Sequence, residues 1–309
     1  MTSPFLLQAA TPPFPGSGEA AALAGAMVWG IATVLYAHSF RRGHPLDAVW
    51  FKNTISALVL TAAAVLFPVA WGGGMPGAGE ASWILVSGLF GLCIGDFLYF
   101  LALSKIGVGR TVILSQLTPA ATALLAWPLF GQGLSAWQWS GLGLVVAGGI
   151  LAESRLLGRK GRTAGLGGVA AALGCMLAWT VGNLTMHRGL AETGPVTAGA
   201  LRLLAGSAGF LLWFLWRGEL GKRLRLLVAR DAWRAYGIPT FLGTVLGMSL
   251  YAAAFKWSKQ GVAAALSAAV PLFAIPLSVW LFRERPGGRG WGGALLVMGG
   301  VALLSLLRD

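Results

Sequence analysis

The stretch that decides the fold is GLCIGDFLYFLALSKIGVGRTVILSQLTP, residues 91–119, which recurs 152 positions later as GTVLGMSLYAAAFKWSKQGVAAALSAAVP, residues 243–271. Over the longer comparison of Gly91–Gly148 with Gly243–Gly300, 17 of 58 positions are identical. Composition alone would give about five or six identities. Further upstream the offset becomes 150 and aligns Trp29 with Trp179 and Lys52 with Arg202. The chain therefore carries an internal duplication.

The composition places this duplication in a membrane. Hydrophobic residues make up 56% of the 309 residues and charged residues only 11%, whereas a soluble domain carries about 25% charged residues. A spanning helix needs about 20 mostly apolar residues, and continuous apolar runs argue against an alternating β-barrel pattern. The sequence predicts an all-α integral membrane protein with ten spans, at about 20–38, 47–70, 82–103, 111–131, 137–153, 164–185, 195–216, 235–255, 261–282 and 290–307.

Five spans per copy is an odd number, so the second copy must enter the membrane from the opposite side. Inverted repeats of this kind are typical of secondary transporters, which bind substrate near the bilayer midplane at the interface of the repeats. The expected organisation is an extended N-terminal tail (1–18), a first five-helix repeat (19–153), a basic linker (154–163) and a second five-helix repeat (164–309).

The net charge of +13 would suit nucleic-acid binding, but the basic residues form short clusters between apolar runs. Connectors after the odd-numbered spans hold 17 of the 23 Lys and Arg residues, and the opposite face holds four. By the positive-inside rule, the face with 17 basic residues is cytoplasmic and both termini lie outside. Cys93 and Cys175 lie in apolar spans and form no metal-binding or disulfide pattern.

Several motifs recur at equivalent positions of the two copies. A tryptophan is followed by a small residue in spans 1 and 6, and a basic residue lies early in spans 2 and 7. The pattern Tyr-x-x-Ala, a twelve-residue spacer and Ser-x-x-x-Pro runs from Tyr99 to Pro119 and from Tyr251 to Pro271. Phe-Arg-Glu follows span 9 at residues 282–284.

With these motifs, the chain resembles the ten-helix EamA-type members of the drug/metabolite transporter superfamily over about residues 20–307. The resemblance implies export of amino acids and related metabolites, and it implies cytosolic termini, opposite to the charge count. Gly131-Gln132 departs from the Gly-Glu that is common in the family. Span 1 has no acidic residue, so the proton-coupling glutamate of the small four-helix multidrug relatives is missing.

The candidate substrate pathway contains polar and aromatic residues within the spans. Pro119 and Pro271 lie near the middle of spans 4 and 9, where a proline frees a backbone carbonyl and either shapes a site or only bends the helix. Asp96 is the one acidic residue deep in a span, so it should face the bundle interior; it either contacts substrate or protons or makes a structural hydrogen bond. The other candidates are Trp29, Lys52, Tyr99, Ser115, Gln116, Thr118, Trp179, Asn183, Arg202, Tyr251 and Ser267.

These features predict a secondary active exporter of small metabolites such as amino acids, working by alternating access in the cell (inner) membrane. An integral-membrane lipid-modifying enzyme and a non-transporting scaffold are the alternatives, but no dense polar cluster supports the enzyme. The expected partners are a small-molecule substrate and the lipid bilayer. Protons are a candidate coupling ion, with simple facilitated flow as the other option. No catalytic residue, cofactor, metal or nucleic acid is expected, and no oligomer is required.

Overall fold

The computed structural model describes residues 13–39, 45–67, 76–106, 108–154, 165–283 and 287–306. Within these ranges the chain is helical and contains no strand. Most of the expected N-terminal tail and of the 154–163 linker lies outside the described residues, as do Arg41, Arg42 and Glu284.

The first repeat supplies five spans, of which the third and fourth are subdivided. Its elements are α2 (Ser17–Ser39), α3 (Pro45–Leu66), α4 (Ala78–Gly88), η1 (Leu89–Gly95), α5 (Asp96–Ile106), α6 (Val108–Ser115), α7 (Thr118–Phe130) and α8 (Ala136–Glu153). The third span is α4–η1–α5, with a π-helical middle, and the fourth is α6 followed by α7.

The second repeat is subdivided in the same way. Its elements are α9 (Leu166–Gly189), α10 (Pro195–Trp216), α11 (Leu220–Val228), α12 (Arg230–Pro239), η3 (Thr240–Leu246), α13 (Gly247–Trp257), α14 (Gln260–Ser267), α15 (Val270–Phe282) and α16 (Gly287–Leu306). Spans 8 and 9 repeat the π-helical segment and the break. The extra helix α11 has no counterpart among the described residues of the first repeat.

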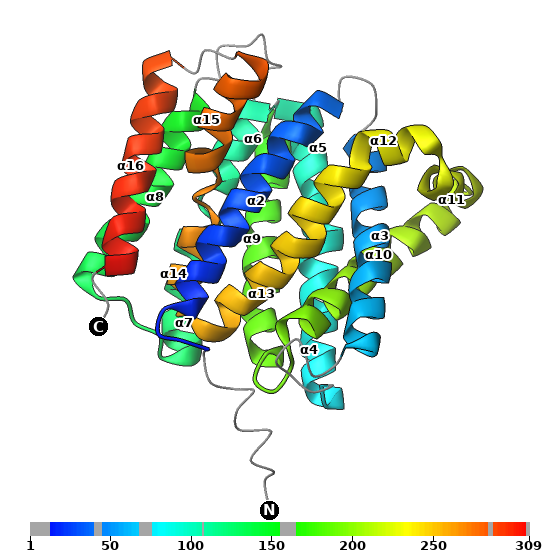
Figure 1. The fold of residues 1–309 in the computed structure, drawn as a ribbon, viewed down its shortest axis with the longest axis horizontal. Coiled ribbons are helices and arrows are strands. Elements are labelled where there is room, and N and C mark those ends of the chain that lie inside the picture. Colours follow the sequence, from blue (N-terminus) through cyan, green and yellow to red (C-terminus); the bar gives the residue numbers. More distant parts are fainter. Residues whose placement is uncertain are drawn as a thin grey trace, which may run out of the picture.

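The ten-span prediction agrees with the fold. Eight described segments are long and apolar enough to cross a membrane, Ala136–Ala152 is a shorter apolar helix, and α16, which packs along α8, is the tenth. Figure 1 shows the spans as one bundle in which α2 begins and α16 ends on the same side, here named the terminal face. The opposite side, where α11 lies, is named the basic face.

The contact between α8 and α16 depends on glycine. A Cβ atom on Gly148 would lie 2.7 Å from the carbonyl oxygen of Gly293, and one on Gly300 would lie 2.6 Å from that of Gly141. Gly141 and Gly148 align with Gly293 and Gly300 at the offset of 152. Small residues let helix backbones approach closely in lipid, so equivalent glycines of the two copies form one seam between the repeats.

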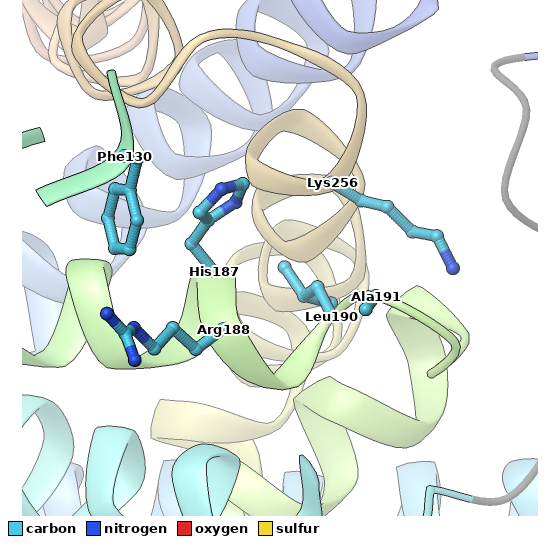
Figure 2. A pocket seen from close by; sticks show the side chains of 6 residues that line it. All are labelled: Phe130, His187, Arg188, Leu190, Ala191 and Lys256. Atoms are coloured by element: carbon cyan, nitrogen blue, oxygen red, sulfur yellow. The ribbon is translucent and has the colours of Figure 1, made fainter. Parts of the chain in front are cut away.

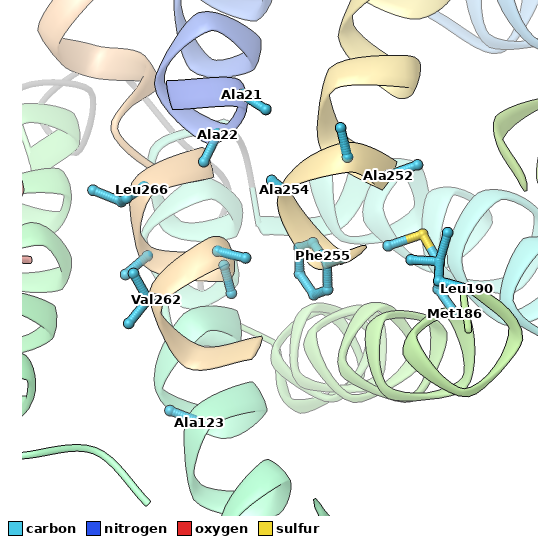
Figure 3. Close-up of a cluster of buried hydrophobic side chains, with 14 of the residues drawn as sticks. Ala21, Ala22, Ala123, Met186, Leu190, Ala252, Ala254, Phe255, Val262 and Leu266 are labelled. Atoms are coloured by element: carbon cyan, nitrogen blue, oxygen red, sulfur yellow. The ribbon is translucent and has the colours of Figure 1, made fainter. Parts of the chain in front are cut away.

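The largest buried cluster lies toward the terminal face. It joins side chains of α2, α13 and α14 with α7 and α9, including Ala22, Phe255, Leu266 and Met186 (Figure 3). Alanine side chains dominate this cluster, so the helices that meet there can pack closely. The two repeats are thus joined firmly at this end of the bundle.

Candidate functional site

Each repeat inserts one tryptophan into the other. Trp29 of α2 donates its indole N–H to the carbonyl oxygen of Gly243 at 2.6 Å, and its ring centroid lies 5.0 Å from that of Tyr251. In the equivalent pair, the centroids of Trp179 and Tyr99 lie 5.3 Å apart. The four aromatic candidates therefore form two symmetric pairs, and each pair joins one repeat to the other.

The indole of Trp179 has a different partner from that of Trp29. It points to the carboxylate of Asp96, with Nε1 3.3 Å from Oδ1. Asp96 also faces Lys52, whose Nζ lies 3.5 Å from Oδ2 and 2.9 Å from Oδ1 of Asn53. Lys52, Asp96 and Trp179 thus form one charged group at the interface of the repeats.

The equivalent place in the second repeat lacks the acid. Arg202, like Lys52, is the eighth residue of its helix, but Met248 occupies the position that corresponds to Asp96. The Nη1 atom of Arg202 lies 3.1 Å from the sulfur of Met186 and 4.0 Å from that of Met248. The residue is 3% exposed, and its guanidinium carbon lies 5.4 Å from the Tyr251 ring centroid.

Arg202 is therefore a buried cation with no described carboxylate within ion-pair distance. Among the described residues its Nε also has no hydrogen-bond partner. A buried charge of this kind is costly unless it is paired. Asp96 lies on the same transmembrane segment as Gly91, on which a Cβ atom would lie 2.7 Å from Nη2 of Arg202.

Asn183 links three helices of the site. Its Oδ1 accepts a hydrogen bond from the Tyr251 hydroxyl at 2.6 Å, and its Nδ2 lies 3.4 Å from Oγ1 of Thr122. Thr122 is absent from the sequence-based candidates, although it follows Pro119 by three residues and so shares a helix face with it.

The two proline motifs begin helices. The breaks fall at Gln116–Leu117 and at Ala268–Ala269, again 152 residues apart, and each proline is the second residue of the following helix. A proline in the first turn loses no helical hydrogen bond. The spans are therefore interrupted at their middle, as expected, but each proline starts a second helix and does not bend a continuous one.

The polar residues beside the breaks are used differently. Thr118 donates to the carbonyl of Ser115 at 2.7 Å, and Ser115 donates to that of Val112 at 2.8 Å, whereas the hydroxyl of Ser267 has no partner among the described residues. Gln116 packs against Gly149 of α8. The structure thus brings it to the wall formed by α8 and not to the charged group.

A polar network at the terminal face escaped the sequence reasoning. His187 lies between the amides of Gln132 and Gln260, with N–N distances of 3.1 Å and 2.9 Å, and the backbone N–H of Gln260 donates to Oε1 of Gln132 at 2.8 Å. The available signals were Gln132, which departs from the Gly-Glu pattern, and His187, four residues after Asn183 on α9. The network ties the connector after span 4 to α9 and α14.

A pocket of about 310 Å³ opens beside this network, lined by Phe130, His187, Arg188, Leu190, Ala191 and Lys256 (Figure 2). The rings of Phe130 and His187 meet edge to face, with centroids 4.8 Å apart, and the Arg188 guanidinium lies 5.6 Å from the Phe130 centroid. Lys256 donates to the carbonyl of Thr193 at 2.8 Å. The described residues contain no group of three or more His, Cys, Asp or Glu side chains that could hold a metal ion.

The two halves of the site are packed unequally. All eight residues of α14 are buried, and α14 packs against α7. In the equivalent α6, only Thr111 of residues 110–115 is buried, and α6 has no comparable contact with α15 among the described residues. Within the second repeat α10 also packs along α13, whereas the equivalent α3 and α5 of the first repeat touch only briefly. The repeats are thus packed together at the terminal face and less closely at the basic face.

Two inverted five-helix repeats around a charged interface define a multi-pass integral membrane protein of the transporter type. A family model described as the EamA-like transporter family matches residues 16–153 and 166–306, and the chain belongs to this family. The resemblance found in the sequence is therefore confirmed.

Individual proteins agree with this assignment. The chain is 28% identical over 128 residues to the "Uncharacterized transporter sll0355" of Synechocystis sp., covering 41% of this chain. It spans only 37% of the length of that relative. A solved crystal structure superposes with a TM-score of 0.75 at 19% identity, covering 94% of this chain and 97% of that one, which supports the fold.

Proposed function

We propose that this membrane transporter is a secondary active exporter of small metabolites such as amino acids, located in the cell (inner) membrane. Its mechanism is alternating access, in which the two repeats exchange conformations around a central site. The observation that carries the proposal is the unequal packing of α14 and α6, because alternating access requires one face to close while the other opens.

The charges of the site favour a zwitterionic substrate. Arg202 is a buried cation with no described carboxylate in direct ion-pair contact, and Asp96 is an acid held by Lys52. The carboxylate of an amino acid would supply the missing partner of Arg202. Its ammonium group would compete with Lys52 for Asp96. By pairing with Arg202, the substrate would lower the free-energy cost of burying that charge, and this would favour binding at the site.

Asp96 is also the best candidate for proton coupling. A carboxylate inside a span costs about 2.5–3.5 kcal/mol on insertion scales, so protonation or pairing with a cation stabilises it there. Competition between Lys52, a proton and a substrate ammonium for one carboxylate links proton binding to substrate release. The second repeat has Met248 at this position, so this linkage belongs to the first repeat alone.

The test uses the purified full chain in proteoliposomes with labelled amino acids, with and without a proton gradient. We expect exchange flux above that of empty liposomes and gradient-driven accumulation by the wild-type protein. Asp96→Asn should lose accumulation but retain exchange, because exchange needs no net proton movement. Met248→Leu, at the equivalent position, should retain both.

Two outcomes would contradict the proposal at different levels. Wild-type accumulation by Asp96→Asn would remove Asp96 from coupling and leave transport itself intact. Cooperative unfolding in the same liposomes shows that the reconstituted protein is folded. If such protein gives no flux for any amino acid tested, the amino-acid substrate class is rejected.

A further inference from the structure

The short helix α11 connects two spans on the basic face and differs from every span in composition. It reads LGKRLRLLV and contains no buried residue. Residues 217–234 around it hold six Lys and Arg residues, whereas residues 71–81 of the first repeat hold none. Figure 1 shows α11 at the outer edge of the bundle, beyond α3 and α10.

One side of α11 is fixed to the bundle. Arg223 forms an ion pair with Asp47 of α3 and a second with Glu219 at 3.1 Å. Trp50 of α3 donates its indole N–H to the carbonyl oxygen of Arg223 at 3.0 Å, and Leu226 and Leu227 pack against buried aromatic clusters. The helix is therefore anchored and its orientation is set.

A second side of α11 is apolar and uncovered. Leu224 and Val228 are four residues apart and so lie on one helix face, and they are 46% and 79% exposed. Trp216, at the end of the span that precedes α11, is 81% exposed. Trp233 donates to the carbonyl of Leu227 at 2.8 Å. Tryptophan is enriched where a membrane meets water, so this strip lies at the expected depth of the interface.

A third side is basic. Lys222 and Arg225 are exposed and three residues apart on one face, and neither forms an ion pair with any described residue. The nearby acid is already engaged, since Glu219 binds Arg217 and Arg223. Its hydrogen bond with Arg223 lowers the pKa of Glu219, which keeps that carboxylate charged. Lys222 and Arg225 therefore lack an anion.

We infer that α11 lies in the membrane surface and binds the phosphates of anionic lipid headgroups through Lys222 and Arg225. Leu224 and Val228 enter the boundary of the acyl chains, as in interfacial amphipathic helices. A soluble anion would satisfy the basic side alone, whereas a lipid satisfies the basic and the apolar sides together. This inference does not depend on what the protein transports.

Lipid binding is tested on the full chain in nanodiscs that contain phosphatidylglycerol and phosphatidylcholine, with bound lipids counted by native mass spectrometry. Each basic residue near an anionic surface contributes about fivefold to binding, so Lys222→Gln/Arg225→Gln should weaken phosphatidylglycerol retention by roughly 25-fold. The control Arg283→Gln/Arg289→Gln removes the same charge from the connector between spans 9 and 10, on the other side of the basic face from α11. It should weaken retention much less, because these residues lie apart from the apolar strip of Leu224 and Val228.

The position of the helix is tested by fluorescence. A polarity-sensitive dye on Val228→Cys, in a background without Cys93 and Cys175, should emit at shorter wavelength than the same dye on Lys222→Cys. Three results would overturn the inference: wild-type phosphatidylglycerol retention by the double variant, an equal loss in the control, or water-like emission at both positions. Displacement of the bound lipid by inorganic phosphate alone would also overturn it, by indicating a soluble-anion site.

Discussion

The half-helices α6 and α14 occupy the same position in the two repeats, yet they have different surroundings. Every residue of α14 is buried at the terminal face, while most described side chains of α6 are only partly covered at the basic face. The two copies therefore share a plan of helices and breaks but not a conformation. A duplicated architecture can hold its halves in two different states at once.

The sequences of these half-helices suggest which face closes more readily. Residues 263–265 of α14 are three alanines, and the equivalent residues 111–113 of α6 are Thr, Val and Ile. Small side chains allow close helix contact in lipid, and branched ones hold helices further apart. If α6 closed against α15, their contact would therefore be looser than the observed packing of α14 against α7.

The largest expected effect follows from filling this close contact. A Cβ atom on Gly261 would lie 2.6 Å from the Cβ atom of Ala123, so Gly261→Val should destabilise the protein by about 1–3 kcal/mol through overpacking. The control Gly143→Val, where no atom lies within 4 Å of an added Cβ atom, should cost much less. Thermal unfolding of both variants in one detergent measures the difference. Equal destabilisation would show that the contact of α14 with α7 is no closer than an open helix surface.

A second prediction concerns the prolines that start α7 and α15. Pro119→Ala and Pro271→Ala permit a continuous helix across the break, so each should lower transport per folded molecule by about tenfold, the rate cost of ~1.4 kcal/mol. Flux is normalised to the amount of detergent-stable protein. Unchanged flux in both variants would make the breaks a packing feature and remove them from the candidate site.

A smaller effect is expected in chemical accessibility. Val112 and Ala264 are equivalent positions in α6 and α14. In a background without native cysteines, Val112→Cys should react with a small maleimide about fivefold faster than Ala264→Cys, because the buried site must first open locally. A saturating concentration of substrate should let the two repeats exchange conformations, and the labelling rates at the two positions should then become similar. A faster reaction at 264 without substrate would reverse the assignment of the closed face.

The smallest effect concerns the network of His187, Gln132 and Gln260. His187→Phe retains a ring against Phe130 but removes both side-chain hydrogen bonds, at a cost of about 1 kcal/mol. It should therefore lower the unfolding temperature slightly and increase labelling of Ala264→Cys. Arg188→Gln, which alters the neighbouring pocket and not the network, serves as the control. If both variants behave alike, the network does not hold the terminal face closed.

The repeat, the ten spans and the mid-span breaks could be predicted because each leaves a local signal in the sequence, such as an apolar run or a shared proline. Asp96 facing the interior followed from the cost of a charge in lipid, but the hydrogen bond between Asn183 and Tyr251 was not predicted. The exchange of Trp29 and Trp179 between repeats was beyond reach, since a single sequence does not state which helices become neighbours.

The contacts of single polar residues could not be predicted. Gln116 was a candidate because it is polar and lies beside a break, and the structure shows that it packs on α8; which side of a span faces the interior depends on tertiary contacts. The network around His187 was missed because its two glutamine partners lie 128 residues apart in the sequence. The cytoplasmic assignment of the basic face remains a prediction, as does the division into tail, repeats and linker.

The glycine seam between α8 and α16 has a consequence for the origin of the protein. Because the seam joins equivalent residues of the two halves, an ancestral five-helix chain inserted in both orientations would meet its own copy through the same glycines. Fusion of two such genes would then preserve an existing antiparallel dimer and require no new contact surface. Later divergence, such as Asp96 in the first repeat where the second repeat has Met248, would give each half a separate task.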